Sequence, residues 1–236
     1  MKFAIIAAGE GSRLQSEGVS APKPLVKVGG EAMIDRLIRV FRKHGAEEIV
    51  VIVNTLNPLT EKHLREKIAR EGAADIRLVV KSTPSSMHSF HALSPYLSDG
   101  PFCLTTVDTI FREEEFAAYL QKFVTGDADG CMAVTDYIDD ESPLYVGTDS
   151  ELHITGFHDT NEGDRYISGG IYCLRPTALR VLDECIKSGQ SRMRNFQRAL
   201  VSAGLRLEAV PFSKILDVDH ESDIAKAEAF LKGGTE

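Results

Sequence analysis

Predicted strands and helices alternate along the first half of this 236-residue chain, and this alternation constrains the fold more than any other feature. Short apolar runs typical of buried strands are separated by segments with a helical hydrophobic period. Such units build an α/β fold, in which a mostly parallel, Rossmann-like sheet is flanked by helices. The predicted strands are 2–8, 49–53, 76–80 and 102–107, and the predicted helices are 32–44, 59–71, one beginning near Ser86, and 113–124.

The second half of the chain has a different pattern. Short, partly alternating apolar segments predict added, partly antiparallel strands at 130–136, 145–148, 153–157 and 168–174. A helix that begins at Pro176, a strand at 205–212 and a closing helix at 219–231 follow. No repeat or linker interrupts the chain, so we expect a single domain over residues 1–232.

Composition and charge exclude several functions. The formal net charge of −8 argues against a nucleic-acid-binding surface, which needs clustered positive charge. No apolar run approaches about 18 residues and no signal-peptide pattern opens the chain, so we expect a soluble, cytoplasmic protein without a membrane partner. The four cysteines lack metal-binding spacing, and we expect them to be buried free thiols.

The stretch A-A-G-E-G-S-R-L, residues 7–14, directly follows the first predicted strand. Leu14 stands where a dinucleotide-binding fingerprint needs its third glycine, and no G-K-[ST] closes the loop as in a P-loop. Its two glycines still let the backbone approach a ligand closely, and Arg13 and Lys23 add two positive charges. A flexible chain between Gly11 and Lys23 could fold over a triphosphate, and we favour this reading over a tight turn with solvated side chains.

Asp108 follows the fourth predicted strand, so it should lie at the same sheet edge as this loop, where ligands of α/β sheets bind. Three further motifs occur in order: F-C-L-T-T-V-D-T-I-F, S-G-G-I-Y-C-L and L-D-V-D-H-E-S-D-I-A-K-A. Together with A-A-G-E-G-S-R-L and P-K-P-L-V-K-V-G-G, they resemble the nucleotidyltransferases that make nucleoside-diphosphate sugars and related activated alcohols. The P-K-P-L and R-L residues are similar to the sugar-1-phosphate and phosphocholine branches. The resemblance covers nearly the whole chain and implies a GT-A-like nucleotidyltransferase fold.

The resemblance implies transfer of a nucleoside monophosphate from an NTP to a phosphorylated acceptor, with pyrophosphate released and Mg²⁺ as cofactor. Arg13 would then bind the β- and γ-phosphates, and Lys23 would bridge the α-phosphate and the incoming phosphate. Asp108 would be the first metal ligand. Asp219 or Asp217 would be the second; the two are two positions apart and face the same side if the segment is extended, and we rank Asp219 slightly higher.

The same resemblance divides the chain into an NTP-binding half, about residues 1–125, and an acceptor-binding half, about 126–232. Two departures from the family pattern are visible. K-S-T-P-S-S-M-H-S-F stands in the base-reading loop, and the E-K-P segment whose lysine contacts the sugar phosphate is missing. Lys214 could substitute for that lysine, although a single lysine is more often a solvated surface charge. The residues expected at the nucleotide are Ala7, Ala8, Gly9, Gly11, Ser12, Lys81 and Ser86, and those expected at the acceptor are Asp136, Gly169, Gly170 and Lys214.

Several alternatives remain at this level. A sugar-1-phosphate is the favoured acceptor, and a broad polar pocket with aromatic side chains would suit it; phosphocholine is second, and a compact aromatic and acidic cage would suit its quaternary ammonium. A nucleotide-binding homologue that does not catalyse a reaction is an alternative of a different class. The presence of all three expected metal-binding aspartates, Asp108, Asp217 and Asp219, argues against it. The sequence predicts neither the nucleobase nor the oligomeric state.

Overall fold

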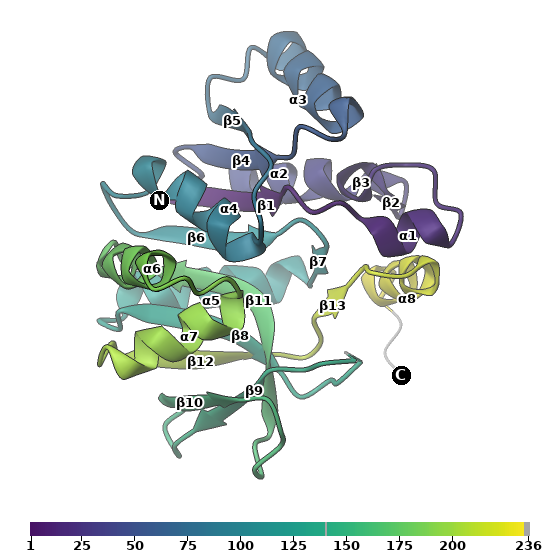
Figure 1. Ribbon diagram of the computed structural model, residues 1–236. Coiled ribbons are helices and arrows are strands. Elements are labelled where there is room, and N and C mark those ends of the chain that lie inside the picture. The colour runs from purple at the N-terminus through teal and green to yellow at the C-terminus, as the bar shows by residue number, and fades with distance from the viewer. Residues whose placement is uncertain (140, 234–236) are drawn as a thin grey trace.

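A computed structural model describes residues 1–139 and 141–233 and contains a nine-stranded mixed sheet (Figure 1). The strands pair in the order β10-β9-β11-β6-β1-β4-β5, and β8 joins β11 to β12. The parallel part consists of β1 (Lys2–Ala7), β4 (Ile49–Val53), β5 (Ile76–Val80) and β6 (Phe102–Thr106). The added part consists of β8 (Gly130–Thr135), β9 (Tyr145–Thr148), β10 (Ile154–His158), β11 (Tyr166–Leu174) and β12 (Leu207–Phe212), with β11 antiparallel to β6.

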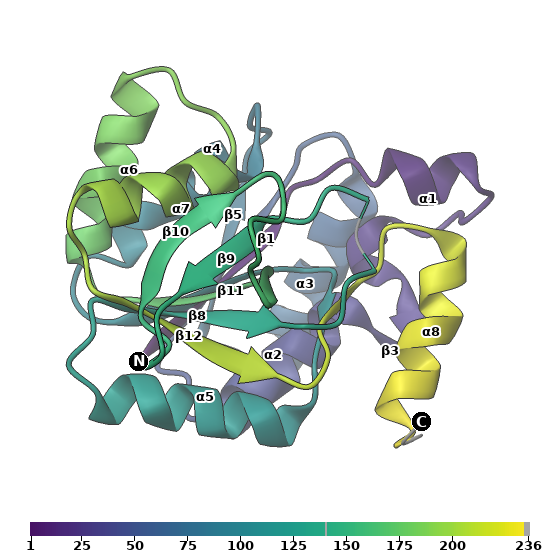
Figure 2. The ribbon, with the colours of Figure 1, turned by 90° about the horizontal axis from the view of Figure 1, so that it is seen from below.

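Helices cover both faces of the sheet (Figure 2). Successive side chains of a strand point to opposite faces, and in β1 Phe3 and Ile5 join one buried cluster while Ala4 and Ile6 join another. The first cluster includes side chains of α2 (Met33–Lys43), α3 (Pro58–Glu71) and α5 (Glu113–Thr125). The second includes side chains of α4 (Ser86–Leu93), α6 (Thr177–Lys187) and α7 (Met193–Ser202).

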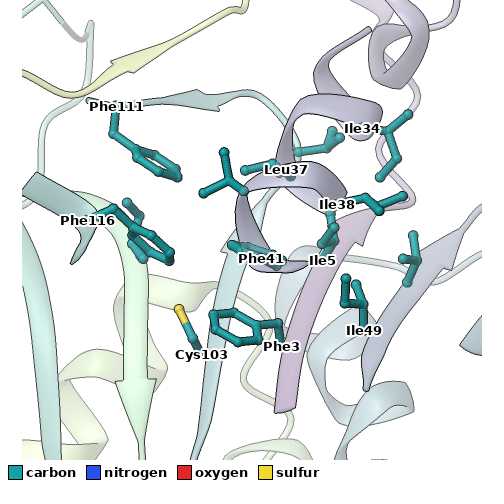
Figure 3. Close-up of a cluster of buried hydrophobic side chains, with 14 of the residues drawn as sticks. Phe3, Ile5, Ile34, Leu37, Ile38, Phe41, Ile49, Cys103, Phe111 and Phe116 are labelled. Atoms are coloured by element: carbon teal, nitrogen blue, oxygen red, sulfur yellow. The ribbon is translucent and has the colours of Figure 1, made fainter. Parts of the chain in front are cut away.

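Aromatic rings fill the first cluster between β1, α2 and α5 (Figure 3). Phe3 stacks on Phe41 with ring centroids 4.5 Å apart, and Phe116 lies 5.8 Å from Phe41 and 4.8 Å from Phe111. These side chains are fully buried, and each contributes on the order of 2–3 kcal/mol through burial. The cluster fixes the sheet beneath the loop that follows β1.

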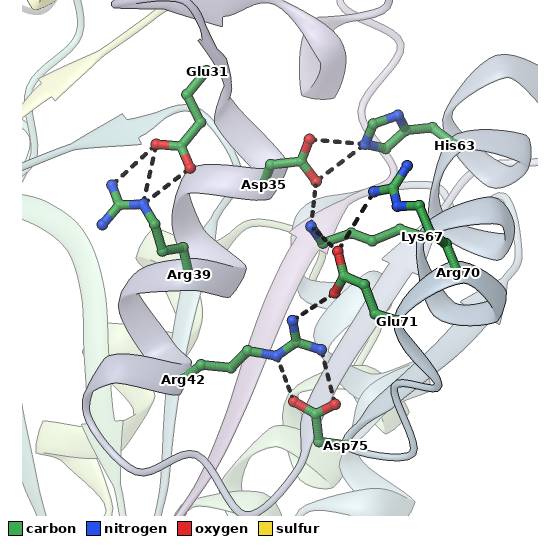
Figure 4. Close-up of polar contacts among 9 residues, drawn as sticks. All are labelled: Glu31, Asp35, Arg39, Arg42, His63, Lys67, Arg70, Glu71 and Asp75. Atoms are coloured by element: carbon green, nitrogen blue, oxygen red, sulfur yellow. Dashed lines mark hydrogen bonds and ion pairs between the residues drawn. The ribbon is translucent and has the colours of Figure 1, made fainter.

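Charged side chains join α3 to α2 (Figure 4). Only Thr60 and Leu64 of α3 are buried, so apolar packing of this helix is limited. Arg42 of α2 donates to Glu71 at 2.7 Å and to both carboxylate oxygens of Asp75. The bonds from Arg42 and then Lys67 lower the pKa of Glu71 to about 2.

A third, smaller cluster supports the segments around the sheet edge. Two residues of β7 (Thr109–Ile110) pair antiparallel with two of β13 (Leu216–Asp217), and β2 (Lys27–Val28) pairs with β3 (Glu31–Ala32). The short helix α1 (Ser12–Ser16) and the last helix α8 (Glu221–Leu231) lie beside them. The buried members of this cluster are Leu14, Val26, Val28, Met33, Ile110, Leu216, Val218, Ala227 and Phe230.

The predicted α/β class is confirmed, and the predicted strands and helices of the first half agree with the structure to within about two residues. Several short elements were not predicted: α1, β2, β3, β7, β13, two 3₁₀ turns, and also α7. The chain expected to be flexible between Gly11 and Lys23 is in part helical, because α1 covers Ser12–Ser16 and buries Leu14. Helix α8 begins at Glu221 and not at Asp219, because His220 and Asp223 form a capping box. Among the described residues, no helix is long and apolar enough to cross a bilayer.

Candidate active site

A cavity of about 320 Å³ opens at the carboxyl ends of β1 and β6. Six predicted residues line it: Ala7, Ala8, Gly9, Lys23, Ser86 and Asp108. Six further polar or turn residues line its walls without having been named individually from the sequence, namely Glu10, Thr83, Pro84, Ser85, Ser89 and Thr106. Four of these, Thr83 to Ser85 and Ser89, come from the β5–α4 connection and α4, whose first turn Ser85 caps by accepting the His88 N–H.

Lys23 lies between this cavity and the third cluster, on a 3₁₀ turn formed by Lys23–Leu25. Its ammonium group bonds to the carboxylates of Asp108 and Asp219, the latter at 2.5 Å. Gly11 makes this position possible: it has φ +66° and a Cβ there would come within 2.8 Å of Lys23 Cβ. A side chain on residue 11 would therefore push Lys23 out of its place.

Electrostatics keep this ammonium group charged. The Lys23 side chain is 12% exposed, and burial alone lowers its pKa. The charges of Asp108 and Asp219 outweigh burial, so that the pKa of Lys23 is raised above its ordinary value. The site thus holds one cation between two carboxylates.

Asp219 reaches the site through the β7–β13 pairing. Leu216 pairs with Ile110 and Asp217 with Thr109, and the Val218 N–H donates to the Asp108 carbonyl at 3.1 Å. This ribbon aligns the chain after β13 with the turn after β6. The exposed Asp217 lies on β13 itself, and Asp219 follows two residues later.

The oxygen atoms at Lys23 fit a hard divalent cation. Asp108 Oδ1 is buried and has no hydrogen-bond partner in the described chain, and carboxylate oxygens are the ligands that such cations prefer. No group of three or more His, Cys, Asp or Glu side chains at metal-binding distances occurs among residues 1–139 and 141–233. A cation held by Asp108 and Asp219 would therefore complete its shell with substrate or water oxygens.

The remaining predicted nucleotide residues lie outside the wall of this cavity. Arg13 projects from α1, is 57% exposed and donates to Asp219 Oδ2 at 3.1 Å. Gly11 and Ser12 begin the turn into α1. Lys81 is exposed, and its backbone N–H donates to the Val53 carbonyl and so continues the β4–β5 pairing.

A second cavity, of about 270 Å³, has Arg13 and Asp219 in its wall, and Asp219 bonds to Lys23 in the wall of the first cavity. Gly169 of β11 lies in its wall, and Gly170, with φ +72°, sits beside Thr109 of β7. Neither Asp136 nor Lys214 lines this cavity. Asp136 pairs with Arg165 at 3.0 Å, and the Lys214 ammonium lies 3.8 Å from the centre of the Tyr137 ring.

The second cavity is predominantly acidic. Lys226 bonds to Asp139 at 2.8 Å and to Asp223 at 3.2 Å, and Arg13 is the other nearby permanent cation in the described wall. Tyr137 is the one aromatic side chain that lines the described part of this cavity. Five carboxylates line it: Asp139, Glu141, Asp217, Asp219 and Asp223. Sequence reasoning named neither Asp139 nor Lys226, because nothing local marks them as different from solvated surface charges.

Comparison with known proteins shows which proteins this chain resembles in sequence. N-acetylmuramate alpha-1-phosphate uridylyltransferase of Caulobacter vibrioides is 31% identical over 169 residues, which is 70% of this chain and 63% of the relative. The bifunctional IPC transferase and DIPP synthase of Aquifex aeolicus is 26% identical over 96% of this chain and 51% of the relative. The chain thus spans between about half and two thirds of the length of these relatives.

Solved structures share the fold. The inositol-1-phosphate CTP transferase from T. maritima superposes with a TM-score of 0.79 over 100% of this chain and 97% of that chain, at 17% identity. The family model described as the MobA-like NTP transferase domain matches residues 3–203. This chain therefore belongs to the MobA-like NTP transferase domain family.

Proposed function

We propose that this protein is a nucleotidyltransferase that moves a nucleoside monophosphate from an NTP to a phosphorylated acceptor and releases pyrophosphate. The observation that carries this proposal is the contact of Lys23 with Asp108 and Asp219, which brings together the walls of the two cavities. A sugar-1-phosphate is the favoured acceptor, since the Caulobacter relative is named for such a substrate. Residues of about 1–125 would bind the NTP, and residues of about 126–232 the acceptor.

The proposed chemistry asks mainly for positioning and charge neutralisation. An acceptor phosphate oxygen attacks the α-phosphorus, the bond from that phosphorus to the bridging oxygen breaks, and pyrophosphate leaves with the electron pair. No protein nucleophile is required. Lys23, at the junction of the cavities, would hold the α-phosphate against the incoming phosphate. Arg13, exposed at the rim, would turn from Asp219 to the departing pyrophosphate.

Transferases of this kind generally use a divalent metal ion, and we propose Mg²⁺ held by Asp108 and Asp219, with Asp217 close by. When bound, Mg²⁺ would neutralise charge on the reacting phosphate oxygens. Asp108 Oδ1 has no partner among the described residues and could bind the ion directly. Lys23 would then exchange its two carboxylates for phosphate oxygens, which preserves its charge pairing.

Phosphocholine is the second candidate acceptor. The carboxylates of Asp139, Glu141 and Asp223 with the Tyr137 ring in one cavity favour a positively charged acceptor group. Against this, one described ring does not make a cage, and Lys226 already neutralises two of the acids.

Pyrophosphate release tests the proposal directly. The protein with Mg²⁺ is offered ATP, GTP, CTP, UTP or dTTP together with each of several sugar-1-phosphates or phosphocholine. We expect release with at least one pair, and release at least about a hundredfold slower with the Asp108→Asn variant. NTP binding without release from any pair would instead identify a non-catalytic nucleotide-binding homologue.

A further inference from the structure

Asn54 occupies the carboxyl end of β4 and is 6% exposed. Its side-chain amide nitrogen donates to two carbonyls of the glycine-rich loop, Ala8 at 3.2 Å and Gly9 at 3.1 Å. Its side-chain oxygen accepts from the backbone N–H groups of Leu56 at 3.1 Å and Asn57 at 2.9 Å. One buried side chain thus fixes the loop after β1 with its nitrogen and the start of α3 with its oxygen.

These bonds determine which way the loop presents its amides. In a trans peptide the carbonyl and the N–H of the same unit point in opposite directions. Holding the carbonyls of Ala8 and Gly9 toward Asn54 therefore turns the N–H groups of Gly9 and Glu10 away from it. Both residues line the nucleotide cavity, and within the described residues neither N–H has a hydrogen-bond partner. Unpaired backbone N–H groups at such a loop are donors for phosphate oxygens.

Thr55, the residue after Asn54, connects this junction to the β5–α4 loop, which lines the same cavity. Thr55 donates its N–H to Ser82 Oγ at 3.0 Å, and the two hydroxyls lie 2.8 Å apart. Ser82 directly precedes Thr83, which lines the cavity from the β5–α4 side. The β4–α3 junction therefore joins two loops that are distant in the sequence.

We propose that Asn54 is a positioning residue for NTP binding: it holds the Ala8–Gly9 backbone so that two free amides face the nucleotide. This inference rests on the proposed function for the identity of the ligand. Asn54 touches loop backbone and not the reacting atoms, so its loss weakens binding of the NTP and leaves the chemical step and the acceptor site unchanged.

The Asn54→Asp variant removes the hydrogen-bond donor of this side chain and keeps its acceptor. Its carboxylate still accepts from Leu56 and Asn57 but has no proton to donate, and it faces two carbonyl oxygens. We expect the Kd and the KM for the NTP to rise at least about tenfold, with kcat at saturating NTP and the KM for the acceptor within about twofold of wild type. The Asn54→Ala variant, which introduces no charge, should show the same pattern and serves if the aspartate variant does not fold.

Asn57→Ala is the matched control. Asn57 caps the same helix by accepting the Leu59 N–H at 3.3 Å, and its side chain makes no bond to the Ala8–Gly9 segment. This variant should lower the Tm and leave the KM for the NTP unchanged. An equal rise in KM for Asn57→Ala, or an NTP Kd within twofold of wild type in folded Asn54→Asp, would overturn the inference.

Titration of NTP without acceptor separates the two proposals. Wild-type protein that binds an NTP in this titration and releases no pyrophosphate when any of the acceptors is then added would refute the transferase, while the effect of Asn54 on Kd would still decide the present inference. A wild-type protein that binds none of the five NTPs would refute both.

Discussion

The Lys23 ammonium lies 2.5 Å from Asp219 Oδ1, although 196 positions separate the two residues in the chain. Lys23 belongs to the segment after β1, and Asp219 belongs to the segment after β13. Together with Asp108, these two residues form a contact between the walls of the two cavities at the edge of the sheet. Charge balance at this point explains why the Lys23 side chain is buried.

Replacement of Lys23 by alanine should lower kcat at least about a hundredfold, because the proposed cation at the transferring phosphate is lost. Asp108→Asn should have an effect of similar size. Steady-state pyrophosphate release measures both, and circular dichroism checks the fold. Turnover like that of wild type in either variant would refute these assignments.

Stability separates the structural role of Lys23 from its catalytic one. Lys23→Ala leaves two facing carboxylates and should lower the free energy of unfolding by about 2 kcal/mol, less than for a fully buried pair because the Asp219 side chain is 40% exposed. The Lys23→Ala/Asp108→Asn double variant should recover much of that loss and stay inactive. Denaturant unfolding without metal gives the comparison; additive losses would show that the carboxylates do not repel each other.

Gly169→Ala should impair acceptor use. A Cβ at residue 169 would come within 2.2 Å of Ile215 Cδ1 and 3.2 Å of the Ala133 carbonyl, so the end of the Ile215 side chain, which also lines the second cavity, must move and the backbone at Ala133 must give slightly. We expect the KM for the acceptor to rise about tenfold, or about 1.4 kcal/mol, with the Kd for the NTP unchanged. Gly100→Ala, where a Cβ meets nothing within 4 Å, is the matched control.

Tyr119→Phe should lower the free energy of unfolding by about 1–3 kcal/mol. The Tyr119 hydroxyl is buried, donates to the Cys131 carbonyl at 2.6 Å and accepts the Cys173 N–H at 2.7 Å. Phenylalanine would leave both backbone groups without this partner. The control is Tyr145→Phe, which alters a half-buried side chain and should change the free energy of unfolding by less than about 0.5 kcal/mol. Equal losses for the two variants in urea unfolding would contradict the argument.

Acid should weaken the α2–α3 connection through Glu71. Bonds from Arg42 and then Lys67 lower the pKa of this carboxylate to about 2 from 4.5. A carboxylate whose pKa is lower in the folded state than in the unfolded state stabilises the fold at pH values above its unfolded-state pKa. The contribution of Glu71 to stability is therefore complete above about pH 4.5 and is lost as the pH falls toward about 2. Glu71→Gln should lower the Tm at pH 7, and its difference from wild type should shrink across that window. A constant difference would show that Glu71 does not couple protons to folding.

The fold could be predicted where one residue pattern dominates its segment. Buried parallel strands such as Ile49–Val53 are continuous apolar runs, and they were found almost to the residue. Elements of two residues, such as β7 and β13, carry no period at all, and they form because their partners lie nearby in the folded chain. Helix α7 has buried Phe196 and Leu200 at a helical spacing, so its apolar pattern does predict a helix there.

The site was predictable to a similar degree. Lys23 and Asp108 stand next to strong local patterns, and the structure places both at one cavity. The direction of a long side chain is decided by partners that the sequence does not reveal: Lys214 lies over the Tyr137 ring, and Asp136 pairs with Arg165. Asn54 gave no signal, because an asparagine after a strand is typical of any turn.

The two-residue ribbon between β7 and β13 also sets the order in which the site can assemble during translation. A ribosome makes the chain from its N-terminus, so a nascent polypeptide contains the glycine loop and Asp108 for more than a hundred residues of elongation before Asp219 emerges. Until then Lys23 has one carboxylate to pair with instead of two. The proposed catalytic centre consequently cannot be completed until more than a hundred residues beyond Asp108 have been made.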